Sequence, residues 1–240
     1  MHPVDFHHPT RPTPASRPPD QGVPALTGIA ATADGLMVGA FATHTTIAAS
    51  PLVARILPAL GRLAGGVGDR RNRDHDTIGA RLGNIRPGGA MDEEGDGDYP
   101  AALLALDATL HAAAPAGRRR LAAQEFLSGN AVAPDTLLAV HFPRPRRAAY
   151  ARFRTPQDHQ AIVGVFVADT QTGARVVVSG GAPGIFRWTA AEDALDQDFS
   201  PDALAGLALD TGAFSSDGHV IAAYRALVAA ATARRAVAAC

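Results

Sequence analysis

The stretch IVGVFVADTQTGARVVVS, residues 162–179, contains the two strongest strand signals of the chain. Its two halves, Ile162–Ala168 and Ala174–Ser179, are rich in valine, which is typical of buried strands. The polar residues Thr170–Gly173 between them predict a turn. We therefore expect these residues to belong to a small antiparallel sheet.

Helical patterns follow these strands. We expect helices at Ala190–Leu195, at Pro201–Leu209 and from about Gly218 onward. The residues spaced to form one apolar face of the last helix are Val220, Tyr224, Leu227, Val228 and Ala231. Strands followed by helices, without a regular alternation of the two, predict an α+β fold.

The first half of the chain contains a second hairpin signal. Asp34-Gly35 lies between the short apolar runs Leu26–Ala31 and Leu36–Phe41. A helix is expected to follow, and its apolar residues recur at spacings of three and four. These residues are Leu52, Ile56, Leu60, Leu63 and Val67.

The ends of this helix can also be predicted. Thr45 or Thr46 can cap its start, because a threonine hydroxyl accepts a hydrogen bond from a free backbone N–H group. Pro51 suits a first turn, whereas Pro58 predicts a break or kink.

The middle of the chain is less regular. Met91–Asp98 is so acidic that we expect a solvated loop, with a divalent-cation site as the weaker alternative. Pro100–Ala108 predicts a buried element, and Leu137–Phe142 predicts a strand. Arg118-Arg119-Arg120 predict a solvated turn, and a contact with phosphate or nucleic acid is the alternative.

The composition excludes several classes of protein. The chain has 240 residues, of which 47% are hydrophobic and 19% charged, so a globular protein is expected. A net charge of −1 does not favour nucleic acid or an anionic membrane as a partner. Cys240 is the single cysteine, which excludes an internal disulfide and a thiolate cluster and favours a reducing cytoplasm. No apolar run reaches the length of a membrane span, and no signal peptide is expected at the start.

Most catalytic signatures are absent. The sequence has no Gly-x-Gly-x-x-Gly after a strand, no Gly-Lys-Ser/Thr loop, no Gly-x-Ser-x-Gly and no His-Glu-x-x-His. His7-His8 cannot form a metal site without further ligands, and a lone His44 or His141 is expected to be structural. We therefore predict neither catalytic nor metal-ligating residues in this chain.

One short stretch, Thr77-Ile78-Gly79-Ala80-Arg81, is informative about binding. A loop of small residues can point successive backbone N–H groups at a phosphate, because no side chain blocks the approach. Taken alone this signal is weak, and a plain turn is the alternative.

A series of motifs in a fixed order gives this loop a context. They begin with a hairpin ending in Gly-Ala, a Thr-rich helix start and an internal Pro-Ala-Leu. They continue with Gly-Asp, the loop itself, and an Asp before Pro-Ala-x-Leu-x-Ala-Leu. The corresponding residues are Gly35–Ala40, Thr43–Thr46, Pro58–Leu60, Gly68-Asp69, Arg73–Arg81 and Asp98–Ala108. Further matches are Glu125–Gly129, Asp135–Leu138, Tyr150–Phe153, Ala161–Val165, Gly184–Arg187 and Tyr224-Arg225.

In this order the motifs resemble the FAD-binding medium subunit of the molybdenum hydroxylases, the family of carbon monoxide dehydrogenase medium subunits and xanthine dehydrogenase flavin segments. The resemblance implies an FAD-binding (PCMH-type) domain with a mixed or antiparallel sheet and flanking helices. A C-terminal domain with a small antiparallel sheet and a helical bundle follows it. The implied division is a Pro-rich extended segment at 1–25, the FAD-binding-type domain at 26–145 and the C-terminal domain at 146–240.

The resemblance also implies a role. In this family the subunit carries FAD, which accepts electrons from the iron–sulfur clusters of a small subunit and passes them to an acceptor. Substrate is hydroxylated at a molybdopterin-binding large subunit, so molybdopterin and 2Fe-2S clusters are expected only in partner subunits. Because the cofactor carries the redox chemistry, such a subunit needs no acid–base residue of its own.

The resemblance assigns the positions that contact the flavin nucleotide. Those expected at the phosphate-side loop are Thr77, Ile78, Gly79, Ala80 and Arg81, with Asp98 as a further polar contact and Leu138 and Arg152 near the ring.

The chain departs from the family pattern at several of these positions. Asp76 stands where the family has glycine, and its carboxylate is expected to repel a pyrophosphate. Ala80 replaces the second glycine of the loop, Arg81 replaces an asparagine, and an insertion of roughly Met91–Gly97 precedes Asp98.

A larger departure lies near the start of the chain. The family's first lobe, which carries Ala-Gly-Gly-x-Ser, is not found between His2–Pro9 and the first hairpin. Two hypotheses follow. The chain is a shortened flavoprotein subunit that holds FAD with help from its partners, or it is a non-catalytic homologue that keeps the fold without FAD.

Overall fold

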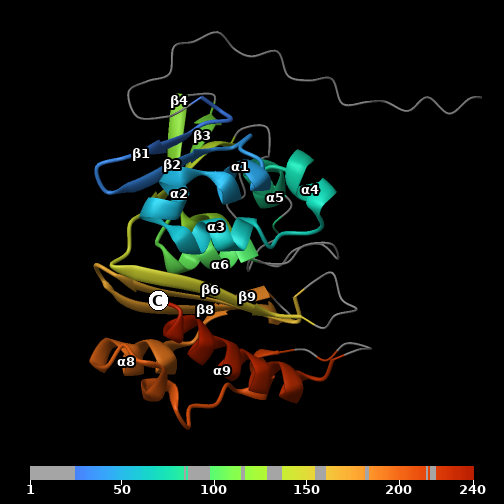
Figure 1. The fold of residues 1–240 in the computed structure, drawn as a ribbon, viewed down its shortest axis with the longest axis vertical. Helices are drawn as coiled ribbons and strands as arrows, with labels where there is room; N and C mark the ends of the chain where they lie inside the picture. The colour runs from blue at the N-terminus through green and yellow to red at the C-terminus, as the bar shows by residue number, and fades with distance from the viewer. Residues whose placement is uncertain are drawn as a thin grey trace, which may run out of the picture.

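The chain folds into two antiparallel sheets, with helices between them and beyond the second. The computed structural model describes residues 25–83, 85, 98–114, 117–128, 137–154, 161–181, 184–214, 216 and 220–240. Figure 1 shows the layers in order: the first sheet, a layer of helices, the second sheet, and the C-terminal helices α8 and α9. The Pro-rich start and the insertion at Met91–Gly97 lie outside the described residues.

The first sheet has five strands in the order β1-β2-β5-β3-β4. These strands are β1 (Ile29–Ala31), β2 (Gly35–Gly39), β3 (Thr109–Ala114), β4 (Gly117–Ala122) and β5 (Leu137–Pro143). β1 and β2 form the hairpin predicted around Asp34-Gly35, with Ala31 opposite Leu36. All pairings between the described strands are antiparallel, so of the two sheet types expected the antiparallel one is present.

The second sheet has four strands in the order β6-β7-β8-β9. They are β6 (Arg147–Phe153), β7 (Val163–Thr170), β8 (Gly173–Gly181) and β9 (Gly184–Arg187). The central hairpin, β7 and β8, closes at the turn predicted at Thr170–Gly173. The chain passes from one sheet to the other between Pro143 and Arg147, close to the domain boundary expected at 145, and the division into domains stays a prediction.

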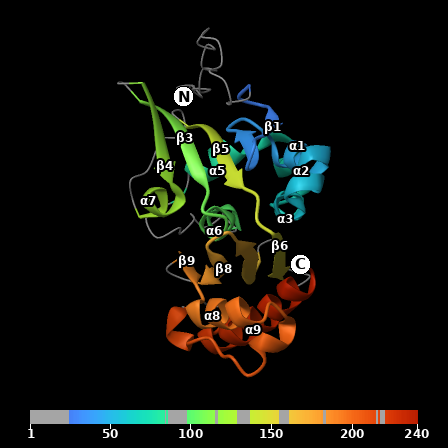
Figure 2. The same ribbon diagram turned by 90° about the vertical axis from the view of Figure 1, so that its left-hand side faces the viewer.

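Short helices pack beside the first sheet and between it and the second sheet (Figure 2). They are α1 (His44–Ala49), α2 (Pro51–Ile56), α3 (Pro58–Ala64), α4 (Arg70–His75), α5 (Ile78–Gly83), α6 (Asp98–Ala105) and α7 (Ala123–Leu127). The single helix expected after the first hairpin is therefore divided into α1, α2 and α3. Ser50 caps α2, and both Pro51 and Pro58 occupy first turns, where a missing N–H costs nothing. Thr43, rather than Thr45 or Thr46, caps α1.

The second sheet is buried on both faces. Phe166, on one face of β7, belongs to the core that includes the first sheet and α6. Val165 and Val167, on the other face, pack in a second core with α8 (Thr189–Gln197) and α9 (Ala222–Ala238). Alternate residues of a strand point to opposite faces, so the near-continuous apolar run read from the sequence reflects a strand covered on both sides.

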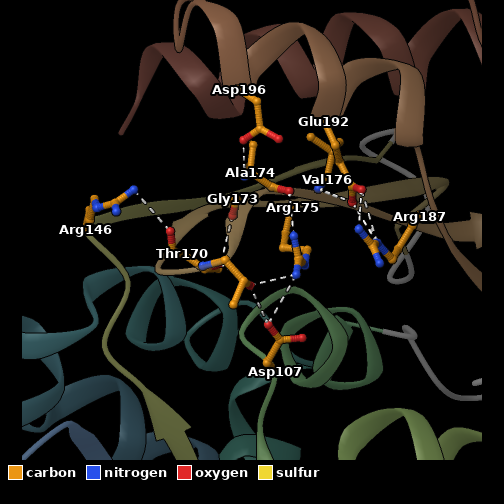
Figure 3. Close-up of polar contacts among 11 residues, drawn as sticks. Asp107, Arg146, Thr170, Gly173, Ala174, Arg175, Val176, Arg187, Glu192 and Asp196 are labelled. Carbon is orange, nitrogen blue, oxygen red and sulfur yellow. Dashed lines mark hydrogen bonds and ion pairs between the residues drawn. The ribbon is translucent and has the colours of Figure 1, made fainter.

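Polar contacts fix α8 and the end of α6 to this sheet (Figure 3). Glu192 is buried; its carboxylate accepts a hydrogen bond of 3.0 Å from Val176 N and pairs with Arg187 at 2.5 Å. Asp196 accepts from Ala174 N at 2.6 Å. On the other side of the sheet, Arg175 lies 3.5 Å from the Asp107 carboxylate, which follows α6. These contacts connect the sheet to both neighbouring layers.

Two further predictions about local structure are wrong. Arg118–Arg120 lie in β4, paired with β3, rather than in a turn. All three are exposed on the edge strand of the sheet, where charged side chains protect against pairing with other chains. Only Pro201–Leu204 of Pro201–Leu209 is helical, as a short 3₁₀ turn.

The apolar face predicted for the last helix is also wrong for most of its residues. Leu227 of α9 is 69% exposed and Tyr224 is 41% exposed, whereas Val228 is buried as predicted. The rest of the buried face consists largely of small residues: Ala226, Ala229, Thr232, Ala233 and Ala236, with Val237. Small side chains let the helix lie close to β7 and β6, and this close approach decides which face is buried.

Candidate functional site

The stretch predicted to meet a phosphate, Thr77–Arg81, begins at the link between α4 and α5, and its residues from Ile78 onward form the first turn of α5 rather than a loop. We nevertheless call residues 76–81 the Asp76 loop. It runs beside the chain that leaves β2, with Thr77 in a β-bridge to Thr43. The Thr77 hydroxyl accepts a hydrogen bond of 3.2 Å from Ala80 N and so caps the first turn of α5.

The backbone donors of the Asp76 loop are directed into the protein. Ile78 N donates to Ala42 O at 3.1 Å, Gly79 N to Ala40 O at 2.8 Å and Arg81 N to Thr77 O at 3.0 Å. Ala80 N donates to the Thr77 hydroxyl, and Thr77 N donates to Asp76 Oδ1 at 2.9 Å. Each of the five N–H groups at 77–81 therefore has an acceptor within the chain.

Gly79 is required here by packing. A Cβ atom at this position would lie 2.6 Å from Ala40 O and 3.0 Å from Ala40 Cβ, closer than real contacts allow. Ile78 is fully buried beside it, and Ala80 is exposed. The sequence suggested that Gly79 allows a ligand to come close. In the structure, Gly79 instead allows the Asp76 loop to pack closely against Ala40.

The Asp76 carboxylate is the charged group that Arg81 and His44 both face. Its Oδ2 lies 3.2 Å from Arg81 Nε and 3.4 Å from His44 Nε2. Partial burial raises the pKa of Asp76, but the hydrogen bond from His44, the charge of Arg81 and the Thr77 N–H together outweigh burial and leave the pKa below its usual value of 3.8. Asp76 is therefore ionised at neutral pH.

A buried pair continues this network inward. His44 is fully buried, and its Nδ1 lies 2.9 Å from the Tyr99 hydroxyl. Burial raises the pKa of Tyr99, so its hydroxyl keeps its proton and can donate to Nδ1. When the Tyr99 hydroxyl donates to Nδ1, the proton of the His44 ring stands on Nε2, where it is directed at Asp76.

The remaining predicted contacts face other parts of the fold. Asp98 is 2% exposed and its Oδ1 accepts from the Ser179 hydroxyl at 3.4 Å, so it faces the second sheet. The Arg152 guanidinium donates to Gly66 O, after α3. Leu138 lies closer to the Asp76 loop, because its carbonyl accepts from Ala40 N at 2.9 Å and Ala40 in turn accepts from Gly79 N. The backbone contacts therefore connect Leu138 to the Asp76 loop, whereas the contacts of Asp98 and Arg152 given above lead to the second sheet and to the end of α3.

The sequence reasoning missed the link from Asp76 through His44 to Tyr99. Residue 44 was expected to be structural, and Tyr99 carried no signal apart from its place after Asp98. A useful signal would have been the pairing of an unusual acidic residue at 76 with a histidine in the segment that runs beside it.

These observations test whether the Asp76 loop fits the pyrophosphate of FAD. A pyrophosphate needs N–H donors and cations that are available to it, whereas here the donors are committed to the chain and Arg81 already faces a carboxylate. A further anion beside Asp76 would be repelled. The loop as it stands does not fit a pyrophosphate.

The low pKa of Asp76 gives a prediction for stability. The free energy of unfolding of an Asp76→Asn variant at pH 7 is expected to be about 1–2 kcal/mol lower than that of the wild type. The reason is that the variant loses charge-assisted hydrogen bonds. The stabilisation by an ionised Asp76 is fully present above its ordinary pKa of 3.8 and disappears as the pH falls through the lowered folded value. Urea titrations between pH 7 and pH 3 check this, and a difference that stays constant over the whole range would contradict it.

Neither a metal-binding cluster nor a membrane-spanning helix is found in the described parts of the chain. Within those parts of the chain, no group of three or more histidine, cysteine, aspartate or glutamate side chains is placed to hold a metal ion. Among the helices described there, none has the length and apolar character needed to cross a membrane.

Comparison with known proteins identifies relatives along most of the chain. Residues 21–145 match the family described as the FAD binding domain in molybdopterin dehydrogenase. The nicotine 6-hydroxylase medium subunit of Paenarthrobacter nicotinovorans is 31% identical over 218 residues, which cover 85% of this chain and 74% of that protein. The carbon monoxide dehydrogenase medium chain of Afipia carboxidovorans is 27% identical over 232 residues, covering 88% and 76%.

A solved structure agrees with these relatives. A chain of the Cu,Mo-CO dehydrogenase in its cyanide-inactivated form superposes with a TM-score of 0.70 and 26% identity. The match covers 89% of this chain and 77% of that one. The fold and the order of elements are therefore shared beyond residue 145, through the second sheet and the C-terminal helices.

Proposed function

Since the chain belongs to the family of FAD-binding medium subunits of the molybdenum hydroxylases, we propose that it is the medium subunit of such a complex. In this role it docks with a molybdopterin-binding large subunit and a 2Fe-2S small subunit. The complex then uses FAD to accept electrons from the iron–sulfur clusters and to pass them to an external acceptor. The substrate is selected at the molybdenum subunit, and the cytoplasmic location expected from the single cysteine remains a prediction.

One observation supports this proposal above the others. The similarity to medium subunits extends over 85% of the chain, so it includes the second sheet and the C-terminal helices as well as the FAD-binding-type half. The surfaces that a medium subunit uses for its partners can therefore be present even where several flavin contacts have changed.

The contacts at the Asp76 loop favour a second candidate. A homologue that keeps the fold and docking surface but does not bind FAD would have no need for available donors at residues 77–81. The carboxylate at position 76, with Arg81 and His44 around it, is consistent with such a protein. In the first candidate, groups from the partner subunits must complete the FAD site, because this loop does not supply it.

The two candidates differ in one measurement. The full chain is produced with and without candidate molybdopterin-binding and 2Fe-2S subunits from the same genome, and the visible spectrum of each preparation is recorded. The first candidate predicts a stable three-subunit complex with flavin absorption bands. A complex that forms but shows no flavin bands after addition of FAD would favour the second candidate. Failure of the subunits to associate would exclude the medium-subunit role.

A further inference from the structure

Two N–H donors and one cation converge on the Asp76 carboxylate. Thr77 N donates to Oδ1, and the His44 Nε2 and Arg81 Nε atoms face Oδ2 at 3.4 and 3.2 Å. The His44 side chain is fully buried and the Arg81 side chain is 15% exposed, so both groups have been removed from water in favour of this contact. A cation, a ring N–H and a backbone N–H that meet at one point are the components of an anion-binding site.

We propose that these donors form an anion site which the chain fills with its own Asp76 carboxylate, so that a phosphate group can enter only when that carboxylate is removed. The site itself stands on the contacts of Asp76. The identity of the excluded anion, a phosphate of FAD, rests on the proposed function.

The backbone presents the carboxylate to this site. Asp76 N donates to Asn72 O at 2.7 Å at the end of α4, and His44 N donates to Asp76 O at 3.3 Å. Because its main chain is held on both sides, the Asp76 carboxylate is tethered beside the site. It therefore competes with external anions for the site at a high effective concentration. An external anion must displace it against that advantage and against the repulsion between two negative charges.

The site is also accessible from solvent. The Asp76 side chain is 30% exposed, whereas the histidine beneath it is fully buried. Removal of the carboxylate would therefore open a small polar space with its donors at the bottom and water above. Formate, which has the shape of the missing carboxylate, and inorganic phosphate, which has the chemistry of the excluded group, are suitable probes.

The test is rescue of an Asp76→Gly variant by these anions. The melting temperature of the full chain is measured against increasing sodium formate or sodium phosphate, with sodium chloride at matched ionic strength as the reference. We expect a saturable rise of about 4 °C for the glycine variant at ten times the dissociation constant of the anion. The wild type and Asp76→Asn are expected to follow the chloride reference, because their side chains occupy the site.

The opposite results would overturn the proposal. If the glycine variant responds to formate and phosphate no more than the wild type does, the donors do not form an anion site. If Asp76→Gly does not fold, Asp76→Ala takes its place, since alanine restores backbone restraint without restoring the carboxylate. Equal binding of phosphate by the wild type and the variant would show that Asp76 does not exclude it.

A last measurement separates this inference from the proposed function. Flavin content is compared between wild-type and Asp76→Gly chains assembled with the partner subunits. Rescue by formate without flavin in either complex would support the anion site and contradict the FAD-carrying role. A wild-type complex with as much flavin as the variant would support the FAD-carrying role and overturn the exclusion.

Discussion

Replacement of Phe166 by alanine is expected to lower the free energy of unfolding by about 3–5 kcal/mol. The ring is fully buried on β7 and lies 6.2 Å from the ring of Tyr150. It belongs to the core that joins the second sheet to α6 and the first sheet. Its loss therefore leaves a cavity between the two halves of the chain rather than inside one of them.

Urea unfolding with two probes checks this prediction. Trp188 is the single tryptophan and is buried in the second core, so its fluorescence reports on the C-terminal half, while far-ultraviolet circular dichroism reports on the whole chain. Because both cores pack on the same second sheet, both transitions are expected to shift together. Phe41→Ala is the matched control, since Phe41 is 43% exposed, and it is expected to cost less than about 0.5 kcal/mol. Equal costs for the two variants would refute the role given to Phe166.

Gly79→Ala is expected to destabilise the protein by about 3 kcal/mol, the upper range for forcing a methyl group into a packed site. The new Cβ atom would lie 2.6 Å from Ala40 O, a backbone atom that cannot move without disturbing β2. The hydrogen bond from Gly79 N to the same oxygen would be lost or lengthened. Thermal or urea unfolding of the isolated chain measures the effect without any cofactor.

Gly65→Ala is the matched control for this variant. Gly65 ends α3 with φ −64°, and a Cβ atom there would find nothing nearer than Gly61 O at 3.3 Å and Ala48 Cβ at 3.6 Å. We expect a change within about 0.5 kcal/mol in either direction. If Gly79→Ala were as mild as this control and instead reduced the flavin content of the assembled complex, the glycine would serve a ligand and not the packing of the Asp76 loop.

Much of the fold could be predicted from local sequence. Asp34-Gly35 and Thr170–Gly173 mark two of the hairpins, because a turn needs particular residues at particular positions. The valine-rich runs of β7 and β8 marked a buried sheet, and the order of motifs identified the family. These signals lie within a few residues of one another or in a fixed order, so they can be read without knowledge of the tertiary structure.

Other features depend on partners that are distant in the sequence. β4 pairs with β3 although its three arginines look like a turn, since an edge strand tolerates charged side chains that a loop would also carry. In α9 the sequence suggested a face of large side chains, whereas Leu227 is exposed and alanines are buried. The distance between helix and sheet decided this face, and no pattern within the helix reports that distance.

The same contrast holds for the hairpin of β7 and β8 and for the candidate site. Residues 162–179 by themselves determined a hairpin, but only the tertiary structure covered both of its faces and assigned Phe166 to one core and Val165 to the other. Likewise the sequence indicated that Asp76 is unusual and that an anion would be repelled there. Only the fold placed His44, 32 residues away, and Arg81 around that carboxylate, because burial and charge compensation depend on which segments lie side by side.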